Sequence, residues 1–201
     1  MMHEFGKHIY RLFADAIHGW EDVDDIYALA FVSLNKDDDL RFPTIHLMYN
    51  TYTQWHATTP RQQGDTWPYA SDSDEAKWNN PFWLSTIHAS VGSYFDDDVT
   101  GDQLHQEWIE HLGLWYDKTD HQDYEIKGSQ ICDQFDDLCV QIATQLQPVI
   151  LTRCNCTLPI LFFDREGLSP EAIAQIYRAN EPASIDEFRG WIERSQMGPK
   201  H

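Results

Sequence analysis

The sequence predicts a single α+β domain, in which helices cover a mainly antiparallel sheet. The chain has 201 residues, of which 42% are hydrophobic, so it is long enough to bury a core and short enough for one domain. Residues 26–34 are apolar on both alternating faces, which is typical of a central strand. Other segments repeat apolar residues at helical spacing. Together these patterns favour mixed helices and strands over an all-α or all-β protein.

Three strands are predicted. Residues 26–34 form the first, and a polar turn at residues 35–39 leads to a second at residues 40–50, whose start is irregular because it contains Pro43. These two form a β-hairpin. Residues 157–163 read as a third, buried strand. Residues 85–95 fit either a further strand or a helical turn, and periodicity does not separate the two.

Three helices are predicted to cover the sheet, at residues 5–18, 101–116 and 129–147. The first ends near Gly19, and the third extends from Ser129 as N-cap to Pro148, which stops it. Their apolar stripes are Phe5, Ile9, Phe13 and Ile17; Leu104, Trp108, Leu112 and Trp115; and Ile131, Phe135, Leu138, Ile142 and Leu146.

Two shorter helices are predicted near the C-terminal end of the sequence. Ser169 is placed to cap one whose first position is Pro170, and Asn180 ends that helix. The sequence from Ser184 to Glu187 has the spacing of a capping box, which predicts that the last helix begins there.

The central part of the chain is predicted to be irregular but ordered. Residues 53–85 contain several prolines and tryptophans, and their only helical pattern is a short one at residues 73–78. Solvated linkers rarely contain tryptophan, so this segment is expected to pack. Trp67 and Tyr69 are candidate interface residues within it. Trp78 and Trp83, like Trp108, are expected in the core. A second polar loop is expected at residues 117–128.

The charge of the chain is strongly negative and regional. There are 33 acidic and 14 basic residues, for a formal charge of -19, which disfavours direct binding to nucleic acid. Residues 96–137 hold thirteen acids and only two lysines. Such a field favours a basic protein partner. The alternatives are an acidic surface kept for solubility, or an organism whose proteins are acidic in general.

The sequence predicts a cytoplasmic protein without a membrane span. The first residues lack the apolar core of a signal peptide, and no window reaches the roughly 18 apolar residues that a membrane span needs. The four cysteines are expected to be structural, reduced thiols. A C-x-C pattern at residues 154–156, with no histidine close by, is a weak zinc motif.

No motif in the sequence indicates an enzyme. The glycines are scattered, so there is no phosphate loop, and the G-x-S-x-G pattern of serine hydrolases is absent. Residues 96–102 lack the ligand spacing of a calcium loop and are expected to form a solvated turn before a helix. The sequence therefore predicts no cofactor, no metal site and no catalytic residues.

The histidines leave two interpretations open. Glu107 and His111 share a helix face and could hold a metal with two further ligands, or they could be a solvated pair. His46 and His88 could face each other across the sheet, or each could be a hydrogen-bonded structural residue.

Several segments resemble a bacterial family known as domain of unknown function 4303. They are residues 25–31 as a first strand, residues 75–78 in a Trp-bearing central segment, residues 158–164 as a late strand, and residues 178–182 as an Asn-Pro turn before a last helix that ends near Trp191. In that turn Glu181 stands between the Asn and the Pro, unlike the family pattern. The resemblance implies a compact α+β domain with no assigned catalytic residues. Small acidic domains of this kind resemble immunity proteins that accompany bacterial toxins.

These observations favour a non-enzymatic acidic binding protein, specifically an immunity protein that blocks the basic active site of a bacterial toxin. The predicted contact residues are Asp96, Asp97, Asp98, Asp102, Asp120, Asp123, Glu125, Trp67 and Tyr69. The alternative is a metal-dependent hydrolase that gathers His56, His88 and His111 in the Trp-rich segment. A third possibility is a structural or regulatory subunit with no toxin partner. The sequence does not specify the oligomeric state.

Overall fold

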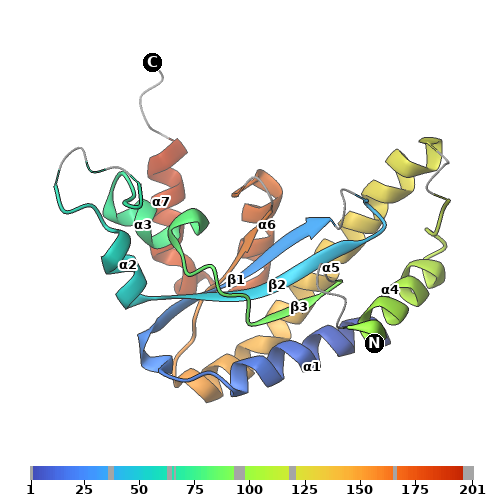
Figure 1. Cartoon of the computed structure of the whole chain (residues 1–201), viewed down its shortest axis with the longest axis horizontal. Helices are drawn as coiled ribbons and strands as arrows, with labels where there is room; N and C mark the ends of the chain where they lie inside the picture. The colour runs from blue at the N-terminus through green and yellow to red at the C-terminus, as the bar shows by residue number, and fades with distance from the viewer. Residues whose placement is uncertain are drawn as a thin grey trace.

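The computed structural model describes residues 2–35, 39–62, 65, 67–92, 98–117, 121–164 and 167–196. It is a single α+β domain built on a four-stranded sheet with the order β3-β2-β1-β4 (Figure 1). This confirms the predicted fold class. The helices gather along one face of the sheet and around its two ends.

The sheet is mostly antiparallel, as predicted. β1 (Ile26–Asn35) pairs antiparallel with β2 (Pro43–Thr51), so the predicted hairpin is confirmed. The ambiguous segment supplies β3 (Ala89–Val91), a short strand antiparallel to β2. β4 (Ile160–Phe163) pairs parallel with β1 on its other side. β2 and β4 each begin three residues after the predicted start. β2 begins at Pro43 rather than residue 40, and β4 begins at Ile160 rather than residue 157.

The sheet is buried on both faces, which explains why β1 is apolar at every one of its first seven positions. Phe162 and Phe163 follow each other in β4 and so point to opposite faces. The ring of Phe162 lies 5.4 Å from that of Phe31 in β1, and the ring of Phe163 lies 5.7 Å from that of Trp83. The sheet therefore contributes to one core on each side.

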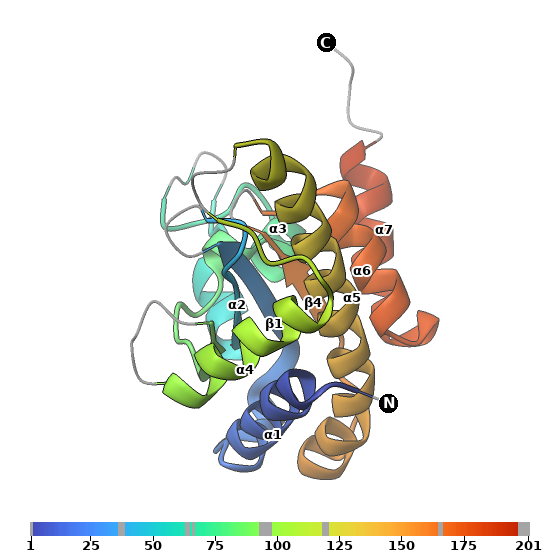
Figure 2. The same cartoon turned by 90° about the vertical axis from the view of Figure 1, so that its right-hand side faces the viewer.

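One face is covered by α1 (Glu4–His18) and α5 (His121–Cys154), which lie side by side, with α4 (Val99–His111) packed against α1 (Figure 2). The predicted stripe of α1 is confirmed, because Phe5, Ile9, Phe13 and Ile17 are fully buried. The ring of Phe13 reaches that of Phe31 at 5.2 Å.

α4 is shorter than predicted and ends at His111 rather than at residue 116. Gly113 adopts a left-handed conformation with φ of 71°, which ends a helix and which glycine tolerates best. Trp115 then leaves the predicted stripe and lies over the guanidinium of Arg41, 5.4 Å from its carbon. Arg41 also donates to Asp39 and to the carbonyl of Tyr116, which ties this segment to the β1–β2 hairpin.

α5 is longer than predicted at both ends: residues 121–128 of the expected loop are helical, and the predicted N-cap at Ser129 and stop at Pro148 are wrong. Gly128 is helical and buried, and a Cβ there would lie 2.8 Å from Leu40. A proline inside a helix costs about 3 kcal/mol locally. The helix continues through Pro148 because Leu146 and Ile150, on either side of it, are both fully buried.

Three further elements follow β4, and one short turn joins α1 to β1. α6 (Pro170–Ala179) confirms its predicted cap, because the Ser169 hydroxyl accepts from the Ala172 N–H. The 3₁₀ turn η4 (Pro182–Ile185) then precedes α7 (Asp186–Gln196). The predicted capping box is wrong: Ser184 lies inside η4, where its hydroxyl donates to the Glu181 carbonyl. Another 3₁₀ turn, η1 (Val23–Asp25), joins α1 to β1.

The Trp-rich segment is less irregular than predicted. The short helix at residues 73–78 is confirmed as α3 (Ser73–Trp78), and η3 (Asn80–Phe82) follows it. The prediction missed α2 (Tyr52–Thr58), whose N-cap is Thr51, with its hydroxyl accepting from the Gln54 N–H. A Thr followed three residues later by Gln is a capping-box pattern, so the sequence did contain a signal for this helix.

Candidate functional site

The predicted contact residues do not form one surface. Trp67 and Tyr69 lie in the loop between α2 and α3, at one end of the molecule, whereas Asp98 and Asp102 lie at the start of α4, at the other (Figure 1). The start of α5, which carries Glu125, lies toward the same end of the molecule as α4 in Figure 1. Asp96, Asp97 and Asp120 are outside the described residues, as is the side chain of Asp123.

Asp98 has a positioning task inside the fold. Its carboxylate is the N-cap of α4, accepting from the Gly101 N–H at 2.9 Å, and it also bonds His8 Nε2 on α1 at 2.8 Å. Gly101 permits this close approach, because a Cβ there would lie 2.0 Å from the carboxylate. Asp98 is therefore engaged between α1 and α4, which sequence reasoning could not foresee because His8 is 90 residues away.

The acidic end is the name used here for five exposed acids on α4 and the first half of α5. None of them has an ion-pair partner among the side chains that the structure describes. On α4, Gln103 donates to Glu107 and Gln106 donates to Glu110, both at 2.8 Å, so two carboxylates are held by neutral amides. The negative charge of this end is therefore not neutralised by described side chains. The five acids are Asp102, Glu107, Glu110, Glu125 and Asp133.

Asp136, a partly buried carboxyl on α5, has a raised pKa. Burial is the main cause that raises the pKa of Asp136 on α5 from 3.8 to about 6, and Asp133, Asp137 and Asp164 raise it further. A hydrogen bond from Gln175 on α6 opposes the shift. Asp137, the next residue, pairs with Arg178 at 2.7 Å. Sequence reasoning missed Asp136, because only tertiary structure brings α6 and β4 beside α5.

The aromatic end, at the opposite side of the molecule, is built around Lys77. Its ammonium lies 4.5 Å from the ring centre of Trp55 and 4.8 Å from that of Trp78, and it pairs with Glu187 on α7. The Lys77 carbonyl accepts from the Tyr27 hydroxyl at 2.5 Å and from the Trp83 indole at 2.9 Å. Burial raises the pKa of Tyr27, so its hydroxyl stays protonated as a donor.

A hollow of about 370 Å³ opens beside Lys77. Its two cations both have carboxylate partners, because Lys77 pairs with Glu187 and Arg194 pairs with Asp74 at 2.6 Å. The charges of this hollow are therefore satisfied within the fold. The lining residues are Trp55, Asp74, Lys77, Trp78, Asp186, Glu187, Gly190 and Arg194.

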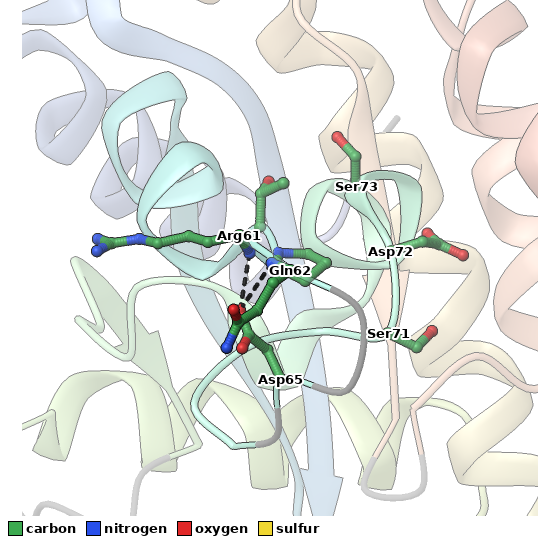
Figure 3. Close-up of a pocket in the computed structure, with 8 residues that line it drawn as sticks. Arg61, Gln62, Asp65, Ser71, Asp72 and Ser73 are labelled. Atoms are coloured by element: carbon green, nitrogen blue, oxygen red, sulfur yellow. Dashed lines mark hydrogen bonds between the residues drawn. The ribbon is translucent and has the colours of Figure 1, made fainter.

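A second hollow, of about 510 Å³, lies in the loop between α2 and α3 (Figure 3). The Asp65 carboxylate in this hollow accepts hydrogen bonds from the backbone N–H groups of Arg61 and Gln62, so it stabilises the loop backbone. The Arg61 guanidinium lies 5.8 Å from the ring of Tyr69, which is half-buried. Trp67, in contrast, is 74% exposed.

The histidines proposed for a hydrolase do not gather. His56 on α2 stacks on Trp55, His88 stacks on Tyr49, and His111 on α4 stacks on His3. Within the described ranges, no group of three or more His, Cys, Asp or Glu side chains could hold a metal.

His46, His88 and the cysteines lie at structural positions within the fold. His46 on β2 forms a hydrogen bond with the Ser90 hydroxyl at 2.8 Å, while the ring of His88 packs against that of Trp20. All four cysteines are free thiols. Burial raises the pKa of Cys132 to about 12 and that of Cys139 above its ordinary value, so these two thiols are protonated at neutral pH.

No protein-family model matches the chain, and neither a curated protein nor a solved structure matches it. The geometry and charges of the two ends are therefore the features that bear on function. Of the helices in the described ranges, none has the length and apolar character needed to cross a bilayer.

Proposed function

We propose that the protein is a non-enzymatic binding protein whose acidic end captures a basic protein partner. The partner that best suits this proposal is a bacterial toxin domain with a basic active site, which would make the chain an immunity protein. The observation that carries the proposal is the set of exposed carboxylates on α4 and α5 without a cationic partner among the described side chains. The resemblance to the domain 4303 family agrees with it.

The physical basis is electrostatic complementarity. An uncompensated acidic surface accelerates encounter with a basic surface and disfavours partners of like charge. Carboxylates on helices hold their spacing, so they can imitate the phosphates that a basic active site binds. Binding of this kind weakens as salt screens the charges, with a Debye length of about 8 Å at physiological ionic strength.

The proposal uses a smaller set of contact residues on α4 than the sequence predicts. Asp98 already binds Gly101 and His8, so Asp102, Glu107 and Glu110 are the better probes on α4. Trp67 and Tyr69 lie at the far end and would contact the same partner only if it spanned the molecule.

The first experiment is to isolate the protein from its native host at natural abundance, wash it at low and high salt, and identify the proteins that co-purify. A basic partner that is released at high salt is expected. With that partner in hand, its affinity is measured for the triple variant Asp102→Asn, Glu107→Gln and Glu110→Gln. We expect a loss of at least about tenfold and a weaker salt dependence, because three carboxylates no longer attract the partner.

A matched control separates location from net charge. The variant Glu171→Gln, Glu181→Gln and Glu193→Gln removes the same charge from exposed acids on α6, η4's N-terminus and α7. It should bind nearly as tightly as the parent chain. Equal losses in both variants would show that only total charge matters. The immunity role has a separate readout: the parent chain should protect cells that express the partner, and the α4 variant should protect them poorly.

A further inference from the structure

Three of the contacts between α1 and α4 involve histidine. The ring of His3 lies 5.4 Å from that of His111, the ring of Phe5 lies 4.6 Å from that of His105, and His8 bonds Asp98 at 2.8 Å. Figure 2 shows the two helices packed together. Histidine is the side chain whose charge normally changes near neutral pH. The six residues that make these three contacts are called the α1–α4 seam here: His3, Phe5, His8, Asp98, His105 and His111.

His105 is the buried member of the seam. It is 2% exposed and stacks on Phe5 with an angle of only 3° between the rings. Its other ring neighbours, Phe42, Trp108 and Phe135, come from the hairpin, α4 and α5. None of these four aromatic neighbours can ionise.

No charged side chain among the described residues would offset a positive charge on the His105 ring. Its Nε2 makes no hydrogen bond to any residue that the structure describes. Burial alone lowers the pKa of His105 to about 3, and no charged side chain contributes to the shift. A proton can therefore bind this ring readily only when α4 has moved away from α1.

A positive charge on the histidines would affect the other two contacts in opposite directions. Protonation of both His3 and His111 would place two positive charges on stacked rings, next to the Glu4–Lys7 ion pair. Protonation of His8 would instead strengthen its bond to Asp98. Both of those side chains keep some exposure, 16% and 17%, so the gain is modest. The buried His105 dominates, because an unpaired buried charge is the least favourable of these states.

We propose that the α1–α4 seam is an acid-sensitive latch, whose equilibrium shifts toward separation of α4 from α1 as the pH falls below about 6. The sign follows from linkage: the open state binds a proton at His105 that the closed state excludes, so closure weakens as pH falls through the ordinary histidine range. The inference concerns the fold and does not depend on the proposed partner.

The test is hydrogen exchange of the full chain at pH 7 and pH 5, read by mass spectrometry and corrected for the intrinsic effect of pH. The opening constant of α4 is expected to rise roughly 25-fold, the ratio given by a histidine pKa of about 6.5 in the open state and about 3 in the closed state. Protection of β1 and β2 should stay the same. Unchanged protection of α4, or equal loss in α4 and the sheet, would overturn the proposal.

Two variants assign the effect to His105. His105→Phe keeps a ring against Phe5 but cannot take a proton, so its α4 should lose the pH response. His56→Phe changes an exposed histidine on α2 and should retain the response. If His105→Phe does not fold, His105→Gln serves the same purpose. A full pH response in the folded His105 variant would contradict the latch.

Discussion

The two ends of the molecule use their charged residues differently. At the aromatic end, Lys77 and Arg194 are each paired with an acid, and indole rings surround the Lys77 ammonium. At the acidic end, exposed carboxylates have no cationic partner among the described side chains. Asp74 and Glu187 pair with cations at one end, whereas the five acids of the acidic end have no such partner among the described side chains.

The two ends also differ in how their residues contribute to the free energy of unfolding. The aromatic end gains stability from buried rings, since Trp78 and Trp83 are 4% and 5% exposed. On α5, beside the acidic end, burial raises the pKa of Asp136, and the nearby carboxylates of Asp133, Asp137 and Asp164 raise it further. Neutralising an acid should thus lower the free energy of unfolding at the aromatic end and raise it on α5.

The largest effect is expected from the aromatic end. Trp78→Ala removes a buried ring that contacts Tyr27 and Phe188, and should lower the free energy of unfolding by about 3–5 kcal/mol. The control is Trp67→Ala, at a ring that is 74% exposed, with a change within about 0.5 kcal/mol. Urea unfolding measures both. Similar losses in the two variants would contradict the assignment of Trp78 to the core.

A smaller effect of opposite sign is expected on α5. A carboxyl whose folded pKa is raised, here to about 6, makes the folded state less stable above that pH and favours it as the pH falls toward 4. Asp136→Asn should therefore raise the free energy of unfolding by about 1–2 kcal/mol at pH 7, with the gain disappearing near pH 4.

The control for that gain is Asp186→Asn on α7, an exposed acid 3.7 Å from Arg189. It should change stability by less than about 0.5 kcal/mol at either pH. Urea unfolding at pH 7 and pH 4 compares the two. A loss of stability in Asp136→Asn at pH 7 would mean that the Gln175 hydrogen bond outweighs the repulsion.

The smallest effect concerns the ion pair at the aromatic end. Glu187→Gln should lower the free energy of unfolding by about 1 kcal/mol or less, because the Glu187 side chain is 73% exposed and Lys77 keeps its ring contacts. Glu193→Gln, also exposed on α7, is the control and should have no measurable effect. A loss of several kcal/mol in Glu187→Gln would show that the rings alone do not hold Lys77.

Local sequence patterns predicted much of the fold. The apolar run of residues 26–34, the stripe of α1 and the cap at Ser169 depend on neighbouring residues in the chain, and each is confirmed. α2 was missed although Thr51 and Gln54 mark its start. The errors at Ser129 and Pro148 have another origin, because burial on both sides of Pro148 outweighs its local penalty.

The sequence by itself determined the α+β class, the hairpin and a regional excess of acid, because these follow from composition and short-range periodicity. Only the tertiary structure decided that Trp67 and Asp102 lie at opposite ends, that Asp98 binds His8, and that His105 is enclosed by rings. These features join residues far apart in the chain, and no local pattern records which helix faces will meet. Long-range packing therefore determines which acids are paired within the fold and which stay exposed.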